Sequence, residues 1–191
     1  MVVLSAITLV VIGGLFVLFL EYTQVERIAE PVSSINEYLG SEKSQFFETA
    51  GIKHSIPLDK IKNGGPPKDG IPSIDNPKFV SVQNANFMSD SNTVIGLEIN
   101  GIAKAYPLFV LVWHEIVNDS VGNVPVAVTY CPLCYTNQVF ERIIDGKEVE
   151  FGTSGKLYNS NLLMYDRLTE SYWSQALGIA VKGELTGYEL N

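Results

Sequence analysis

Cys131 and Cys134 are the side chains most able to do chemistry in this chain, and they are its only cysteines. Two residues separate them, a spacing that lets both sulfurs bind one metal ion or form a disulfide with each other. The apolar, β-branched stretch from Val124 to Tyr130 predicts a strand, and Pro132 ends it. We therefore expect the two thiols at the end of a strand.

The spacing leaves three chemistries open for this pair. A structural disulfide is one, although so short a loop restricts the unfolded chain little and stabilises the fold poorly. A redox dithiol is the second, since Cys-Pro-x-Cys is similar to thioredoxin-like active sites. That fold begins a helix at the first cysteine, whereas Tyr135 to Phe151 predicts a hairpin. The third chemistry, a metal site, is the favoured hypothesis.

A metal site needs a third ligand, and His114 is the candidate. The chain has only two histidines, and we expect the other one, His54, at the surface. Apolar residues at helical spacing predict a buried helix over residues 107–118, which carries His114. The turn over residues 119–123 would fold this helix back on the cysteine strand and bring the imidazole to the thiols.

Copper is the favoured metal and zinc the second choice. Two thiolates and one imidazole suit both metals, but a closed zinc site usually has four protein ligands. Met164 is a candidate weak further ligand. Around the ligands, Glu115 is a candidate hydrogen-bond partner of the histidine, and Asp166 could orient the same ring.

The N-terminal segment predicts a membrane anchor. Val2 to Leu20 contains no charged residue and, as a helix, is long enough to cross about 30 Å of hydrocarbon. We expect residues 1–20 to be a single transmembrane helix in the lipid bilayer, 21–55 a stalk, and 56–191 an extracytoplasmic domain. A third functional alternative follows from the anchor, namely a non-catalytic accessory subunit of a membrane protein complex.

The charge of the chain excludes some partners. Its formal net charge is -8 at pH 7, and its Lys and Arg residues are scattered, so a basic face for nucleic acid is not expected. With 46% hydrophobic residues, the chain can supply the core of a globular domain beside the anchor.

Turn signals predict the fold class. Asn100-Gly101 lies between the apolar segments 94–99 and 102–106, and Asp145-Gly146 between 138–144 and 147–151. Such dipeptides favour hairpins. We expect an α+β, β-rich fold that is mainly antiparallel, with one short buried helix. The proline- and glycine-rich stretch 57–77 is predicted to be a linker or a long ordered loop over the domain surface.

Four stretches of the sequence together resemble one family, the domain of unknown function 3179. They are Trp113–Asp119, Thr129–Cys134, Ser154–Asn159 and Met164–Ser171, in the order of the family's motifs. The resemblance covers roughly residues 56–190. It implies that His114, Cys131, Cys134, Tyr158 and Asp166 belong to family motifs and share one site.

Two departures from the family pattern concern the thiols and the chain end. Tyr135 stands where similar sequences more often have a small residue, which would narrow access to the cysteines. Members of the family usually continue past the point that matches Asn191, so we expect a final segment to be missing.

Overall fold

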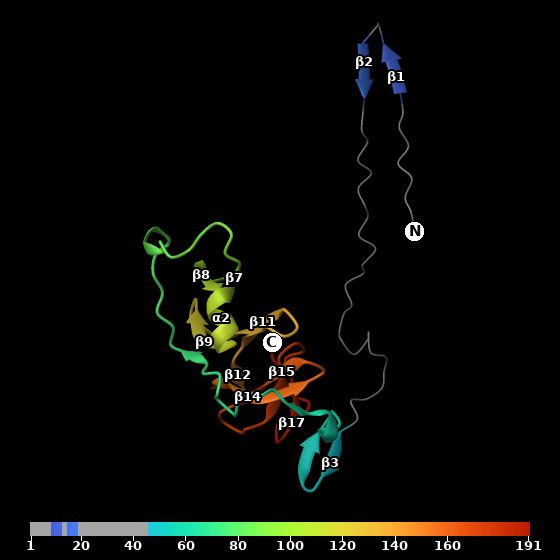
Figure 1. Cartoon of the computed structure of the whole chain (residues 1–191), viewed down its shortest axis with the longest axis vertical. Helices are drawn as coiled ribbons and strands as arrows, with labels where there is room; N and C mark the ends of the chain where they lie inside the picture. The colour runs from blue at the N-terminus through green and yellow to red at the C-terminus, as the bar shows by residue number, and fades with distance from the viewer. Residues whose placement is uncertain (1–8, 13–14, 19–45) are drawn as a thin grey trace. The chain divides into compact units, whose positions relative to one another are not determined.

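The structure, a computed structural model, describes residues 9–12, 15–18 and 46–191. The chain divides into two compact units, Met1–Lys43 and Ser44–Asn191. In the first unit, β1 (Leu9–Ile12) and β2 (Leu15–Leu18) form an antiparallel pair (Figure 1). These eight residues are strands where the sequence predicts a helix over 2–20, and the rest of that segment lies outside the described residues. No described helix is long and apolar enough to cross a membrane.

The second unit begins earlier than the predicted boundary at residue 56. Residues 21–45 of the predicted stalk lie outside the described residues, but β3 (Phe47–Thr49) and β4 (Ile52–His54) belong to a sheet of the folded domain. The expectation of a surface position for His54 is wrong, since its side chain is 6% exposed and its Nδ1 lies 2.9 Å from the Ile56 carbonyl oxygen.

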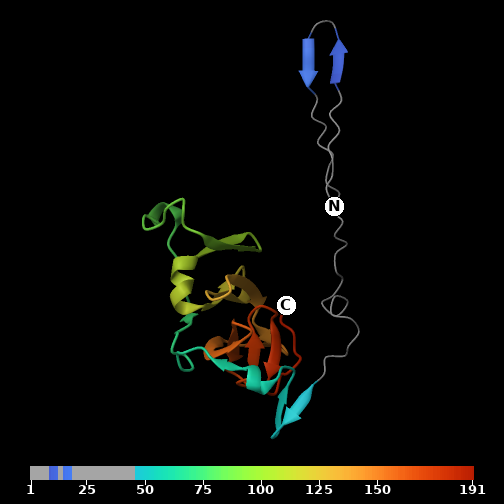
Figure 2. The same ribbon diagram turned by 45° about the vertical axis from the view of Figure 1, so that its right-hand side comes forward.

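A four-stranded sheet carries the cysteines, with the strand order β11-β10-β9-β6. Its strands are β6 (Ile74–Asp75), β9 (Ile116–Val121), β10 (Val124–Cys131) and β11 (Thr136–Glu141). β10 is antiparallel to both of its neighbours, and only β6 runs parallel to β9. Figure 2 shows this sheet between the green hairpin of β7 (Val94–Ile99) and β8 (Ile102–Pro107) with helix α2 (Leu108–His114) and the later strands drawn in orange and red.

A seven-stranded antiparallel sheet forms the second layer, in the order β3-β4-β17-β16-β15-β14-β5. Besides β3 and β4 it contains β5 (Lys62–Asn63), β14 (Phe151–Tyr158), β15 (Asn161–Asp166), β16 (Tyr172–Ser174) and β17 (Ile179–Lys182). A bulge in β14 between Thr153 and Lys156 places Gly155 at φ 69°, where the Pro66 carbonyl oxygen leaves no room for a Cβ atom.

Two separate hairpins and three short helices complete the unit. The hairpins are β7 (Val94–Ile99) with β8 (Ile102–Pro107) and β12 (Ile143–Ile144) with β13 (Lys147–Glu148). Both turn at the predicted dipeptides, Asn100-Gly101 and Asp145-Gly146. The helices are α2 (Leu108–His114) and the 3-10 turns η1 (Leu58–Lys60) and η2 (Val82–Asn84). The β-rich, mainly antiparallel fold with a short helix is confirmed.

The helix prediction over residues 107–118 is wrong at its C-terminal end. The helix stops at His114 because Glu115 adopts φ 58°, and Ile116 then pairs with Thr129 as the first residue of β9. The helix is also less buried than expected: Leu111 is its only buried residue, and Trp113 is 74% exposed. The chain reverses at Gly122-Asn123, and the antiparallel pairing of β9 with β10 brings the end of the helix back to the cysteine strand, where Tyr130 N donates to the Glu115 carbonyl oxygen over 2.8 Å.

Strand β10 is buried on both faces, which explains its nearly continuous apolar sequence. Ala127 and Cys131 belong to the core cluster between the two sheets, together with Phe151 and Trp173. The intervening Tyr130 faces a second cluster that includes Leu111 of α2. Because side chains alternate along a strand, Cys131 and Tyr130 point to opposite sides of the sheet.

The stretch 57–77 is ordered against the domain, but it is not all loop, because it contains η1, β5 and β6. Its backbone pairs with β14 through β5, and further bonds run from Gly64 N to the Gly155 carbonyl oxygen and from Asp69 N to the Thr153 carbonyl oxygen, both over 2.9 Å.

Candidate functional site

The two cysteines flank the tight turn between β10 and β11. Cys131 is the last residue of β10 and pairs with Thr136, the first residue of β11. Cys134 lies in the four-residue connection, which Tyr135 closes with φ 57°. Both cysteines are free thiols, Cys131 with 1% exposure and Cys134 half-buried. Cys134 is therefore the more exposed of the two, and Cys131 lies inside the core.

Side chains from two different sheets meet at the sulfur of Cys134. The hydroxyl of Thr136 lies 3.1 Å from it, and the amide of Asn161, at the start of β15, donates to it over 3.2 Å. The Gln175 Oε1 atom accepts from both of these groups, over 2.7 Å from Thr136 and 2.8 Å from Asn161. The sulfur thus lies among polar groups rather than in an apolar pocket.

A buried network orients Gln175. Its side chain is fully buried, and its Nε2 donates to the Thr129 hydroxyl over 3.0 Å. That hydroxyl donates in turn to the Gln138 carbonyl oxygen over 2.9 Å. The amide can only donate at this end, so its oxygen faces Thr136 and Asn161. Packing and hydrogen bonds therefore hold the site in one arrangement.

The environments of the two thiols shift their pKa values in opposite directions. Burial raises the pKa of Cys131, and the hydrogen bond with Cys134 raises it further. Burial also acts to raise the pKa of Cys134, but hydrogen bonds with Thr136, Asn161 and the other thiol outweigh it and lower this pKa. At a given pH, Cys134 is the thiol that is more often ionised.

His114 makes its contact elsewhere. Its Nδ1 lies 2.8 Å from the Pro72 carbonyl oxygen, and its side chain is half-buried at the end of α2. Among residues 9–12, 15–18 and 46–191, no three His, Cys, Asp or Glu side chains lie close enough to hold a metal ion. The cysteine pair, rather than a three-ligand group, is what the fold brings together, and copper or zinc binding stays a prediction.

The four residues predicted around the ligands have other surroundings. Glu115 is half-buried, and burial raises its pKa to about 7. Tyr158 packs on a small cluster that contains Leu163, while Met164 is fully buried in the cluster that includes Cys131. Asp166 is fully buried and accepts hydrogen bonds within its own turn. None of the hydrogen bonds in the described part of the chain joins these four residues to a cysteine.

Sequence reasoning missed Thr136, Asn161 and Gln175. A signal for two of them exists, since Asn161 precedes the apolar run of β15 and Gln175 directly follows the aromatic strand β16. An uncharged amide next to an apolar strand is costly to bury unless it has partners, and such residues are candidates for a shared polar network.

The fold and the site together define a β-rich domain with a Cys-x-x-Cys pair on a strand-to-strand turn. The family model described as "Protein of unknown function (DUF3179)" matches residues 68–191, and the chain belongs to that family. The match spans the cysteines and the polar groups that surround them. Neither the curated proteins nor the solved structures gave a match.

Proposed function

We propose that the domain is a thiol–disulfide exchange protein, in which Cys134 is the attacking thiolate and Cys131 the resolving thiol. The observation that carries the proposal is the asymmetry of the pair: Cys134 is accessible and receives a hydrogen bond from Asn161, whereas Cys131 is buried. Disulfide exchange needs both an accessible, ionised sulfur and a second thiol within reach.

The exchange reaction has two steps. The Cys134 thiolate attacks one sulfur of a partner disulfide, forms a mixed disulfide and releases the partner's other sulfur as a thiolate. The Cys131 sulfur then attacks Cys134 and releases the partner's remaining sulfur, so that the proton of Cys131 and one proton from water convert the two released thiolates to a dithiol. The partner disulfide is reduced by two electrons, and the Cys131–Cys134 pair is oxidised by two.

The polar network suits both protonation states of Cys134. When the sulfur is a thiol, it can donate to the Thr136 hydroxyl, which donates to Gln175 Oε1 over 2.7 Å. When the sulfur is a thiolate, the same hydroxyl proton can turn to the sulfur, and Asn161 still donates to Gln175 Oε1. No buried polar atom loses its partner in either state.

The place of this chemistry follows from the anchor. We place the protein in the cell membrane through residues 2–20, with the dithiol outside the cytoplasm, where partner disulfides occur. An accessory role in a membrane complex is compatible with this placement, since an anchored dithiol could act on a neighbouring subunit.

Copper binding is the second candidate function, and the position of both thiols at one turn favours it. Cys131 ends β10 and Cys134 lies in the connection to β11, and soft thiolates suit Cu(I). His114 would complete the ligand set through its Nε2 atom, because only its Nδ1 is bonded to the Pro72 carbonyl oxygen. Zinc is less favoured, because two sulfurs leave half of its usual ligand set unfilled.

One experiment on the purified full-length chain separates the two functions. The reduced protein, treated with a chelator, is mixed with a small disulfide, and the released thiol is measured. We expect exchange in the wild type, its loss in Cys134→Ser, and a trapped mixed disulfide in Cys131→Ser. If exchange is equally fast in Cys134→Ser, the redox proposal is wrong.

The copper alternative makes a different prediction for the same samples. One copper per anaerobically purified chain, lost in His114→Ala as well as in both cysteine variants, would establish copper binding. A metal content that does not depend on these side chains would count against it.

A further inference from the structure

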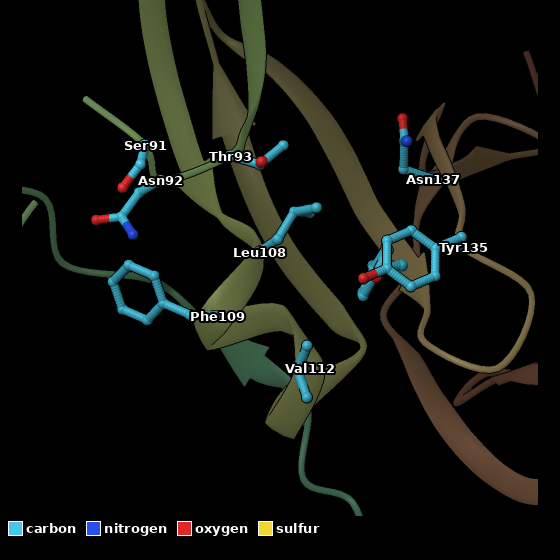
Figure 3. A pocket seen from close by; sticks show the side chains of 9 residues that line it. Ser91, Asn92, Thr93, Leu108, Phe109, Val112, Tyr135 and Asn137 are labelled. Carbon is cyan, nitrogen blue, oxygen red and sulfur yellow. The ribbon is translucent and has the colours of Figure 1, made fainter. Parts of the chain in front are cut away.

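A pocket of about 440 Å³ lies beside the cysteine turn (Figure 3). It opens between α2 and the segment before β7 on one side and the start of β11 on the other. Its lining consists of Ser91, Asn92, Thr93, Leu108, Phe109, Val112, Tyr130, Tyr135 and Asn137. In Figure 3, Tyr135 and Asn137 face Leu108 and Thr93 across the opening.

The pocket lies close to the thiols because the connection between β10 and β11 contains Cys134 and also supplies residues that line the pocket. Tyr135 directly follows Cys134, and Asn137 directly follows Thr136. Tyr130, which precedes Cys131, packs edge-on against Tyr135 with ring centroids 6.0 Å apart. The connection between β10 and β11 therefore carries the accessible sulfur and also one wall of the pocket.

None of the nine lining residues is charged, although the whole chain carries a formal net charge of -8. The apolar floor is partly open to solvent, with Phe109 at 45% and Val112 at 43% exposure. An uncharged apolar group gains free energy by covering this floor. A carboxylate brought into the pocket would lose water without gaining a cationic partner.

The rim suits a peptide backbone. No hydrogen bond is found for the side chains of Thr93 and Asn137 within the described part of the chain, and both are exposed at the opening. A hydroxyl and an amide supply a donor and acceptors for a backbone amide group. The volume is at the small end of the range for ligand pockets, about 300 to 1,000 Å³, and suits one or two side chains.

We propose that this pocket receives an apolar side chain of the substrate, and that the substrate is therefore a polypeptide disulfide flanked by uncharged, apolar residues. The proposal rests on the exchange function proposed above and adds the substrate class. An extended peptide advances about 3.3 Å per residue, so a side chain a few residues from the disulfide reaches the far side of the turn. The pocket then favours some disulfides over others that Cys134 would otherwise attack at the same rate.

The test compares three disulfides on the reduced full-length chain. Two are short peptides that differ only in carrying Phe or Asp near the disulfide, and the third is 2-hydroxyethyl disulfide, which has no side chain to bind. We expect the Phe peptide to react about ten times faster than the Asp peptide. Equal rate constants for the two peptides overturn the proposal.

Two variants assign the preference to the pocket. Val112→Glu places a carboxylate on the floor and should lower the ratio of the Phe-peptide rate to the hydroxyethyl disulfide rate about tenfold. Asn137→Asp does the same from the opposite wall. The matched control is Trp113→Glu, on the same helix and 74% exposed but outside the lining, which should leave the ratio unchanged. An unchanged ratio in both pocket variants overturns the proposal.

The remaining outcomes also decide between ideas. If hydroxyethyl disulfide does not react with the wild type at all, the exchange function itself fails. If it reacts and the peptides show no preference, only the substrate class is wrong. If the wild type is a dimer that Val112→Glu separates, a second copy of the chain covers the pocket and the proposal is wrong.

Discussion

Each of two turns in this domain surrounds an acidic group with hydrogen-bond donors, but the two groups differ in their environment. The Asp166 turn joins β15 to β16, and its carboxylate accepts from Leu168 N over 3.1 Å and from Trp173 Nε1 over 2.9 Å. The cysteine turn joins β10 to β11 and surrounds Cys134 with Thr136 and Asn161. Both turns belong to motifs that carry the family resemblance.

The difference lies in access. Asp166 is fully buried, and its donors come from its own turn and from the core indole of Trp173. Cys134 is half-buried, and its donors come from another sheet and from the far end of its turn. A closed set of donors stabilises a fold, while an accessible acidic group among donors can still react. Two residues that belong to motifs of the same family therefore need not belong to the same site.

The largest effect expected from this comparison is on stability. Asp166→Ala leaves the Trp173 indole and the turn amides without their acceptor inside the core, and should lower the free energy of unfolding by about 3 to 5 kcal/mol. Cys134→Ser should cost less than about 1 kcal/mol, because serine can keep the bonds to Thr136 and Asn161. Urea denaturation measures both. Equal costs for the two variants would remove the distinction between the turns.

The next effect is on reactivity, and it concerns the cysteine turn alone. Asn161→Asp keeps the oxygen that accepts from Ala176 N but removes the donor to the sulfur and adds a negative charge. The pKa of Cys134 should rise, so the pH at half-maximal alkylation moves upward. The rate with iodoacetamide near neutral pH should fall about tenfold, which corresponds to roughly one pKa unit.

A matched control for Asn161 is Gln138→Ala. Its amide donates to the Ala176 carbonyl oxygen over 3.1 Å and makes no contact with either sulfur. We expect its alkylation profile to match the wild type. An equal slowing in both variants would mean that the sulfur responds to general loosening of the turn rather than to the Asn161 donor.

The sequence predicted the strands better than the limits of the helix. Asn100-Gly101 and Asp145-Gly146 mark hairpins whatever the rest of the fold does, because their φ angles are positive, as they are in this structure. Ile116 and Val117 fit both a helix and a strand pattern. Their pairing with β10 makes them a strand, and the local sequence pattern does not show which strand they pair with.

The site was predictable only in its sulfur atoms. The spacing of the cysteines identified the pair, but Asn161 and Gln175 reach it through the packing of the seven-stranded sheet on the four-stranded one. The pairing of β9 with β10 does bring the end of the helix to the cysteine strand, yet the ring of His114 bonds the Pro72 carbonyl oxygen. Which residues become neighbours across two sheets depends on the topology of the fold, and the topology could not be derived from this one sequence.

Glu115 is a third acidic group to compare with Asp166 and Cys134. Its carboxyl group is partly buried, but no hydrogen-bond donor lowers its pKa. Burial alone raises its pKa from an ordinary 4.5 to about 7. In the unfolded chain the carboxyl loses its proton near the ordinary value, whereas in the folded chain it keeps it until about 7. The raised pKa of an acid therefore destabilises the fold progressively as the pH rises through this window, and the loss is complete above it.

Glu115→Gln should remove this pH dependence. Between the two pKa values the wild type should lose about 1 to 2 kcal/mol of unfolding free energy, after allowance for the partial exposure of the side chain. The variant should not lose this free energy. Urea denaturation from roughly pH 5 to pH 8 measures the difference, and Glu98→Gln at an exposed position of β7 is the control. Parallel pH profiles for wild type and Glu115→Gln would mean that water already solvates the carboxylate. Burial without donors would then not distinguish Glu115 from an ordinary surface acid.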